Sequence, residues 1–342
     1  LMSRHEQDVQ FNLSESGVHP ITLRQLIAGQ AGLLDELLDT SIQYPHANGI
    51  PLLRQRIADT YDGASAENVL VTVGGIEANY LAVRTILQPG EEIMLMMPNY
   101  MQVWGIARNH DVNLKTFDLL PEYGWAPDLE ELEAKLSPAT KMIAVCHPNN
   151  PTGRALTVDE MNRIIELASQ NDSWLLSDEV YRGAERQSEA FTPSFYGRYD
   201  RVIAVGSMSK AYGLPGLRVG WICGQKELLP SMWARHEYLT IAASMLSSQL
   251  AAVALQPDRR QQLLRRSRDY IRNGYSVMRN WIDKHQDLFS WTPPDAGAVA
   301  FVKYHHRINS SELVQRLIQE ENVLVVPGDH FGMDHYLRIS LG

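Results

Sequence analysis

Residues 206–221 read GSMSKAYGLPGLRVGW and follow an apolar run, Val202 to Val205, that is typical of a buried β-strand. The stretch contains a single lysine, Lys210, with Ser207 three residues before it and Arg218 eight residues after it. Glycines within the stretch allow the backbone to approach a ligand closely. A hydroxyl, an ammonium and a guanidinium can therefore converge there, so the stretch predicts a phosphate site beside an amine.

A lysine amine next to a phosphate site is what a Schiff base to pyridoxal 5'-phosphate requires. The alternative is that Lys210 is an ordinary surface lysine on a loop. The spacing of Ser207, Lys210 and Arg218 resembles the lysine signature of the class I/II aminotransferases, which are pyridoxal-phosphate enzymes of fold type I. This resemblance implies that Lys210 holds the cofactor as an aldimine while Ser207 and Arg218 anchor its phosphate.

Length and composition limit the possible partners. The chain has 342 residues, which predicts one large domain and a smaller one. Its net charge of −9, without a basic run, argues against nucleic acid. The sequence contains no run of about 18 apolar residues, which a membrane span would require. Charges near the start argue against a signal peptide. We therefore expect a cytoplasmic protein that acts on a small molecule.

Cysteine usage leads to a similar expectation. The two cysteines, Cys146 and Cys223, each lie in an apolar run, which favours buried free thiols over a disulfide. His and Cys residues do not cluster at the spacing of metal ligands, so no metal site is expected.

The N-terminal segment FNLSESGVHP, residues 11–20, contains a glycine that can approach a ligand, Gly17. In the resembled family a glycine in this segment lies near the substrate carboxylate. Glu15, Ser16 and His19 would then flank the substrate side chain. The alternative is that the serines shape a turn and His19 is a surface residue.

Residues 43–61, QYPHANGIPLLRQRIADTY, place Tyr44 five residues before Gly49. This segment resembles the pattern YxxxxGxxxLR of the same family, in which the tyrosine reaches across a dimer interface to the neighbouring cofactor phosphate. The resemblance implies a homodimer. An ordinary turn tyrosine is the alternative.

A strand over residues 68–73 is followed by GGIEANYLAVRTIL, which predicts a helix opening after a glycine turn. Backbone amides at a helix N-terminus bind phosphate, so Gly75 and Ile76 are candidates to present them. A tight strand-to-helix turn is the alternative. After the next strand, residues 92–97, Tyr100 stands where the resemblance implies an aromatic ring stacked on the pyridine ring.

The string PNNPTG, residues 148–153, forms a rigid turn after a strand over residues 141–147. The carboxyl ends of strands are where open α/β sheets bind ligands. By resemblance, Asn150 bonds the cofactor's ring hydroxyl and contributes to substrate binding. A purely structural turn is the alternative.

Asp178 ends another apolar strand, where a buried carboxylate requires a cationic partner. The protonated pyridine nitrogen supplies that partner, and Tyr181 can share the ring hydroxyl with Asn150. Near the C-terminus, Arg338 lies in a strand-like run, and the resemblance implies that it binds the substrate α-carboxylate as a bidentate fork. A surface arginine is the alternative.

Seven strand candidates alternate with helices as far as Trp221–Gly224, which predicts an α/β fold. The expected sheet is seven-stranded, mainly parallel and sandwiched by helices, as in the pyridoxal-phosphate-dependent transferases of fold type I. We expect residues 31–255 to form the large cofactor-binding domain. Residues 1–30 and 256–342 would form a smaller α+β domain.

The resemblance implies an enzyme that abstracts the α-proton of an amino acid, and an aminotransferase is the first hypothesis. Several strings, including FNLSESGVHP and HEYLTIAAS, are similar to members that cyclise a hydroxylated arginine, the capreomycidine and enduracididine synthase type. In that alternative a side-chain hydroxyl is eliminated and the guanidine closes a ring, with Glu15 and His19 holding the guanidinium. A non-catalytic sensor that binds pyridoxal phosphate is a second alternative.

Overall fold

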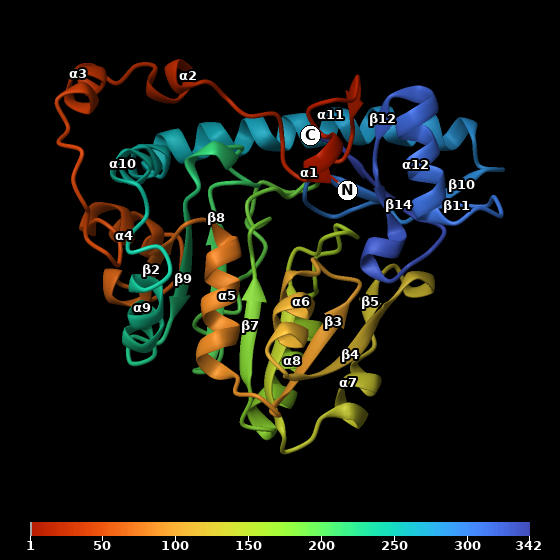
Figure 1. Cartoon of the computed structure of the whole chain (residues 1–342), viewed down its shortest axis with the longest axis horizontal. Helices are drawn as coiled ribbons and strands as arrows, with labels where there is room; N and C mark the ends of the chain where they lie inside the picture. The colour runs from red at the N-terminus through yellow and green to blue at the C-terminus, as the bar shows by residue number, and fades with distance from the viewer. Residues whose placement is uncertain (1) are drawn as a thin grey trace.

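The computed structural model describes residues 2–342 and contains a large and a small β-sheet with helices packed around them (Figure 1). The large sheet has eight strands in the order β2-β9-β8-β7-β6-β3-β4-β5. Its strands are β2 Val69–Thr72, β3 Glu92–Met97, β4 Asn113–Leu120, β5 Ala126–Pro127, β6 Thr140–Cys146, β7 Trp174–Asp178, β8 Val202–Ser207 and β9 Gly220–Gly224.

The sheet confirms the predicted α/β class. Strands β4, β3, β6, β7 and β8 run parallel to one another, whereas β9 runs antiparallel to both β8 and β2. The predicted number of seven strands is wrong, because β5 adds an eighth at the edge, antiparallel to β4. Two residues are too short to produce the alternating pattern by which strands are recognised in a sequence.

Both faces of the sheet are covered, which explains the continuous apolar character of its inner strands. Along β3, Ile93 and Leu95 pack into one hydrophobic core, whereas Met94 and Met96 pack into another on the opposite face. The helices are α1 Met2–His5, α2 Leu23–Ile27, α3 Leu33–Leu38, α4 Pro51–Ala58, α5 Gly75–Ile86, α6 Gln102–Asn109, α7 Leu129–Lys135, α8 Val158–Gln170, α9 Leu229–Glu237, α10 Met245–Ala254, α11 Pro257–Lys284 and α12 Ser310–Glu321.

The small sheet has four strands in the order β10-β11-β14-β13, with α12 packed nearby. Its strands are β10 Phe289–Trp291, β11 Val299–Tyr304, β13 Val326–Pro327 and β14 Tyr336–Ser340. The long helix α11 runs from the α10 side of the molecule to this sheet (Figure 1). A two-residue strand near the N-terminus, β1 Phe11–Asn12, pairs with β12 Val323–Leu324. The domain boundaries after residues 30 and 255 stay a prediction.

Two further observations concern predictions from composition. Cys146 and Cys223 are buried free thiols, as expected. Between residues 2 and 342, no helix combines the length and apolar character needed to cross a bilayer.

Strand β9 supports the glycine turn before α5. Gly220 pairs with Thr72, and a Cβ atom added at Gly220 would overlap the backbone of Gly74 and Gly75. The turn that opens α5 can therefore lie directly on β9 only while residue 220 is glycine.

We expect Gly220→Ala to lower the free energy of unfolding by about 1–3 kcal/mol, because backbone atoms cannot move aside as a flexible side chain can. The matched control is Gly105→Ala in α6, where an added Cβ atom contacts nothing within 4 Å. That change should raise the stability by about 0.5–1 kcal/mol, since alanine favours helix. Denaturant titration of both variants checks the prediction, and equal stabilities would contradict it.

Candidate active site

A cavity of about 290 Å³ lies at the carboxyl ends of β6, β7 and β8. Its walls contain most of the residues that the sequence singles out. The lining residues are Ser16, Gly75, Ile76, Asn79, Tyr100, Cys146, Asn150, Asp178, Val180, Tyr181, Ser207, Ser209, Lys210, Pro215, Arg218 and Arg338.

One end of the cavity presents donors suited to an anion. Gly75 and Ile76 open α5, whose N-terminal amides point outward from the helix. Ser207 ends β8, and its hydroxyl donates to Ser209 Oγ at 3.0 Å. The Arg218 guanidinium donates to the same oxygen at 3.4 Å. Two hydroxyls, a guanidinium and a helix N-terminus therefore converge.

The Arg218 guanidinium reaches this end because of two local backbone conformations. Gly74, with φ +79°, has no Cβ atom, and one placed there would lie 2.6 Å from Arg218 Nη2. Arg218 itself has φ +52°, in the left-handed region that non-glycine residues rarely adopt. The guanidinium therefore lies directly against the turn that opens α5.

Asp178 ends β7 and points its carboxylate into the cavity. Asn79 Nδ2, from α5, donates to Asp178 Oδ2 at 2.8 Å, and the Val180 amide donates to Oδ1 at 3.3 Å. Burial raises the pKa of the Asp178 carboxyl, whereas these hydrogen bonds and the charge of Lys210 oppose the rise. The site therefore places a buried carboxylate where a cation would stabilise its ionised form.

Lys210 projects into the same cavity from the loop after β8. Its Nζ atom donates to Ser16 Oγ at 2.8 Å. Burial and the charges of Arg338 and Arg218 lower the pKa of the amine to about 8, while Glu15 and Asp178 act in the opposite direction. At neutral pH about a tenth of Lys210 would therefore be the neutral, nucleophilic amine, far more than for an ordinary lysine.

Arg338, on β14 of the small sheet, is buried with an exposed fraction of 4%. Its guanidinium donates to Asn150 Oδ1 at 3.2 Å and to the Ser14 carbonyl at 2.6 Å. Burial lowers the pKa of this guanidinium. A buried cation that faces an amide oxygen and a backbone carbonyl is well placed to accept a carboxylate.

Two tyrosines complete the walls. The Tyr181 phenol is buried and lies near the Ser16 hydroxyl, although no hydrogen bond of good geometry to its oxygen is formed within residues 2–342. Burial raises the pKa of this phenol, so it is a proton donor at neutral pH. Tyr100 is 40% exposed at the cavity edge, as a ring available for stacking would be.

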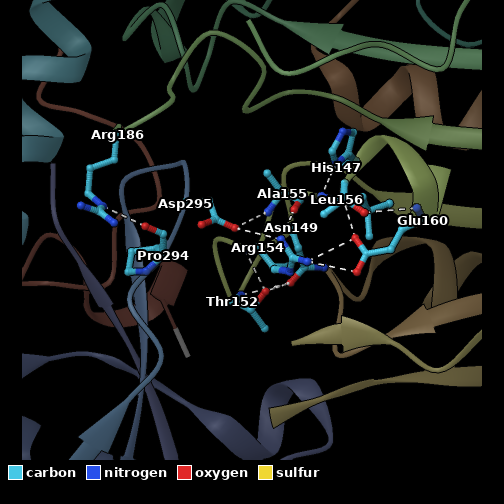
Figure 2. A network of polar contacts seen from close by, with 11 residues as sticks. His147, Asn149, Thr152, Arg154, Ala155, Leu156, Glu160, Arg186, Pro294 and Asp295 are labelled. Carbon is cyan, nitrogen blue, oxygen red and sulfur yellow. Dashed lines mark hydrogen bonds and ion pairs between the residues drawn. The ribbon is translucent and has the colours of Figure 1, made fainter. Parts of the chain in front are cut away.

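The turn that carries Asn150 is fixed by a polar network (Figure 2). Within the turn, Thr152 Oγ1 donates to Asn149 Oδ1 at 2.7 Å. Asp295, from the loop before β11, accepts hydrogen bonds from the Ala155 amide at 3.0 Å and from Arg154 at 3.3 Å. Arg154 also pairs with Glu160 at 3.0 Å. The segment around the Asn150 turn is thus bound both to Asp295, which precedes the small-sheet strand β11, and to Glu160 in α8.

The remaining predicted residues lie outside the cavity lining. Gly17 packs against Lys210, since a Cβ atom added to it would lie 3.7 Å from Lys210 Cδ. Glu15 is exposed, although its charge acts on both Lys210 and Arg338. His19 is exposed, and its carbonyl accepts a hydrogen bond from Arg266. Tyr44 is 79% exposed in a segment without helix or strand. The structure does not bring His19 or Tyr44 into the cavity of this chain.

Two polar lining residues were missed as site residues: Asn79 and Ser209. Helical spacing could have found Asn79, because it follows Gly75 by one turn and faces the same side of α5. Ser209 stands one residue before the lysine. Ser16, expected beside the substrate side chain because it precedes Gly17, lines the cavity and contacts Lys210.

The residues present fit pyridoxal phosphate. The cavity combines an anion cradle at α5, an amine with a lowered pKa, a buried carboxylate without a cationic hydrogen-bond partner among the described residues, and a phenol without a well-aligned partner. Those groups match a phosphate, an aldehyde, a pyridinium nitrogen and a ring hydroxyl in turn. The fold and this site define a pyridoxal-phosphate-dependent enzyme of fold type I.

The chain belongs to the class I and II aminotransferase family, whose family model matches residues 32–342. Among curated relatives, a capreomycidine synthase from Streptomyces vinaceus is 31% identical over 331 residues, which cover 96% of this chain and 84% of that protein. The chain is accordingly an enzyme that uses pyridoxal phosphate and acts on an amino acid.

Two solved structures resemble the whole chain. A pyridoxal-phosphate-dependent aminotransferase from Streptococcus suis 89-1591 superposes with a TM-score of 0.93 at 30% identity, covering 99% of this chain and 90% of that one. The pyridoxal-phosphate-dependent cyclase OrfR superposes with a TM-score of 0.88 at 26% identity, with the same coverage. The fold is therefore shared by enzymes named for two different reactions.

The lowered pKa of Lys210 predicts how the cofactor-free chain takes up pyridoxal phosphate. Only the neutral amine is nucleophilic, so the uptake rate should rise with pH and level off above about 8. Stopped-flow absorbance over a pH series measures the midpoint. A midpoint near 10.5, the ordinary value for lysine, would show that the amine is not perturbed.

Removal of the Asn79 amide should weaken the interaction that holds Asp178 ionised. A hydrogen bond to a charged group contributes about 1.5–3 kcal/mol, so Asn79→Ala should lower kcat about 10- to 100-fold. Cofactor content should persist, because the phosphate donors are untouched. Asn113→Ala, which removes an exposed side-chain amide bonded to the Gly90 carbonyl, is the control. Equal kcat values for the two variants would exclude this role.

Proposed function

We propose that the protein is an amino-acid aminotransferase. The observation that carries the proposal is that Lys210, with a pKa near 8, shares one cavity with Arg338 and Asp178. An amino acid whose carboxylate pairs with Arg338 would bring its α-carbon toward the Lys210 amine. An amine that is partly neutral at physiological pH can both accept and return a proton.

Each residue then has a defined task. Arg338 and Asn150 bind the α-carboxylate, as a guanidinium fork and an amide do. Pyridoxal phosphate, when bound, would supply an electron sink that acidifies the substrate α-proton. Lys210 accepts that proton from the α-carbon and can return it to another atom on the same face of the bound substrate. Asp178 would keep the ring nitrogen of the cofactor protonated, and Ser207 with Arg218 would hold its phosphate.

A second candidate is cyclisation of a hydroxylated arginine. It is supported by the 31% identity to a capreomycidine synthase and by the likeness to the cyclase OrfR. Glu15 supports it as well, because its exposed carboxylate influences both Lys210 and Arg338 and could pair with a guanidinium. In this reaction the side-chain hydroxyl leaves as water, and the guanidine nitrogen bonds to the carbon that it left.

The proposal includes a homodimer in the cytoplasm. Tyr44 is 79% exposed in a single chain, and neighbouring residues expose apolar side chains, including Leu38 and Ile42. A second copy that covers this face would bury them. Tyr44 could then reach the phosphate end of the neighbouring cavity.

Product identification separates the candidate functions. The purified protein with pyridoxal phosphate is incubated with common amino acids, arginine and hydroxyarginines, each with a 2-oxo acid acceptor, and products are identified by mass spectrometry. An aminotransferase converts the amino acid to its 2-oxo acid. A cyclase yields a product that is lighter than hydroxyarginine by one water and retains its amino group.

Lys210→Ala is the control for both reactions. It should bind pyridoxal phosphate through the phosphate donors but turn over no substrate. Cofactor binding without turnover of any substrate by the unaltered protein would favour the sensor hypothesis and contradict the proposal.

A further inference from the structure

The Ser16 hydroxyl is the hydrogen-bond partner of the amine on which the proposed reaction depends. Ser16 Oγ accepts from Lys210 Nζ at 2.8 Å, although 194 residues separate the two positions. Within residues 2–342, no other hydrogen bond of this amine is found. Ser16 is itself buried, with an exposed fraction of 7%, and lines the cavity.

The backbone on both sides of Ser16 is held by contacts, which place the Ser16 side chain next to Lys210. On one side, the Ser14 carbonyl accepts a hydrogen bond from Arg338 Nη2 at 2.6 Å. Ser14 is also bonded to Asn12, whose strand pairs with β12. On the other side, Gly17 packs against the Ser209 carbonyl and the Lys210 side chain. The segment therefore moves little unless Arg338 and Lys210 move too.

Unlike the Ser16 hydroxyl, the charged groups around Lys210 Nζ do not fix the direction of its N–H bonds. Arg338 and Arg218 repel the ammonium form, whereas Glu15 and Asp178 attract it. These charges act without a hydrogen bond to Nζ, so they leave its orientation open. A neutral hydroxyl 2.8 Å away fixes one N–H direction and thereby orients the remaining positions on the nitrogen.

We propose that Ser16 is a further catalytic residue, whose hydroxyl binds Lys210 Nζ and aims the amine at the α-carbon during proton transfer. The proposal rests on the proposed function, in which Lys210 carries the α-proton. The proton passes from the α-carbon to Nζ and onward, and Ser16 neither gains nor loses one. Its role is to accept a hydrogen bond and keep the nitrogen in line.

An isosteric pair of variants tests the hydroxyl alone. Ser16→Thr retains the hydroxyl, whereas Ser16→Val has the same shape without it. In the cofactor-free chain, loss of the acceptor destabilises the ammonium more than the amine, because the charged donor forms the stronger hydrogen bond. The pH midpoint of pyridoxal phosphate uptake should therefore fall by about one unit in Ser16→Val and in Ser16→Ala. Ser16→Thr should keep the original midpoint.

The control for loss of a buried hydroxyl is Ser173→Ala. Ser173 is also buried, and its hydroxyl donates to the Thr140 carbonyl, outside the cavity lining. This variant should retain the midpoint of the unaltered chain. If Ser16→Val and Ser16→Thr have the same midpoint, the proposal is overturned, whether or not the protein turns over amino acids.

Turnover supplies the second readout, once a substrate is known. Ser16→Val should lower kcat about 10- to 100-fold relative to Ser16→Thr and change KM less, since the hydroxyl aims the base and does not bind the carboxylate. A change in KM with unchanged kcat would assign Ser16 to substrate binding and overturn the catalytic role. Absence of any substrate would refute the proposed function, while the uptake midpoints would still test the contact.

Discussion

The cavity concentrates positive charge that its own acidic residues do not balance. Lys210, Arg218 and Arg338 face Asp178 within the cavity and Glu15 nearby. Desolvating such cations is costly unless each finds an acceptor. Within residues 2–342, neutral oxygens accept hydrogen bonds from all three cations: Ser16 from Lys210, Ser209 and the Pro215 carbonyl from Arg218, and Asn150 with the Ser14 carbonyl from Arg338. In the proposed function, a cofactor phosphate and a substrate carboxylate would supply the missing negative charge.

The three cations can lie close together only because the fold brings several separate elements to the cavity. Residues that line it come from strand ends on the large sheet, from the start of α5, from β14 of the small sheet and from the N-terminal segment. No single element could hold three cations close together. The parallel strands β6, β7 and β8 end at one edge, and the antiparallel strand β9 supports the turn that faces them.

The sequence predicted those parts of the site that follow a strand or open a helix. Asp178, Ser207 and Gly75 could be predicted because apolar runs mark where a buried strand ends. Asn79 and Ser209 were missed because a polar residue within a helix or a loop has no periodic signature of its own. The Ser16 contact could not be predicted at all, since it joins residues 194 positions apart. The edge strand β5 was missed because two residues form no pattern.

The hydrogen bond between Arg338 and Asn150 joins the small sheet to the turn at the end of β6, and Asp295 fastens that turn from the other side. These contacts connect the Arg338 guanidinium to the large sheet, from which the Lys210 amine projects. In the proposed reaction, where Arg338 binds the carboxylate, the cavity would favour molecules by the number of bonds between their acidic and basic groups. A β-amino acid, in which that number is larger by one, would engage the guanidinium and leave its reactive carbon out of register with the lysine.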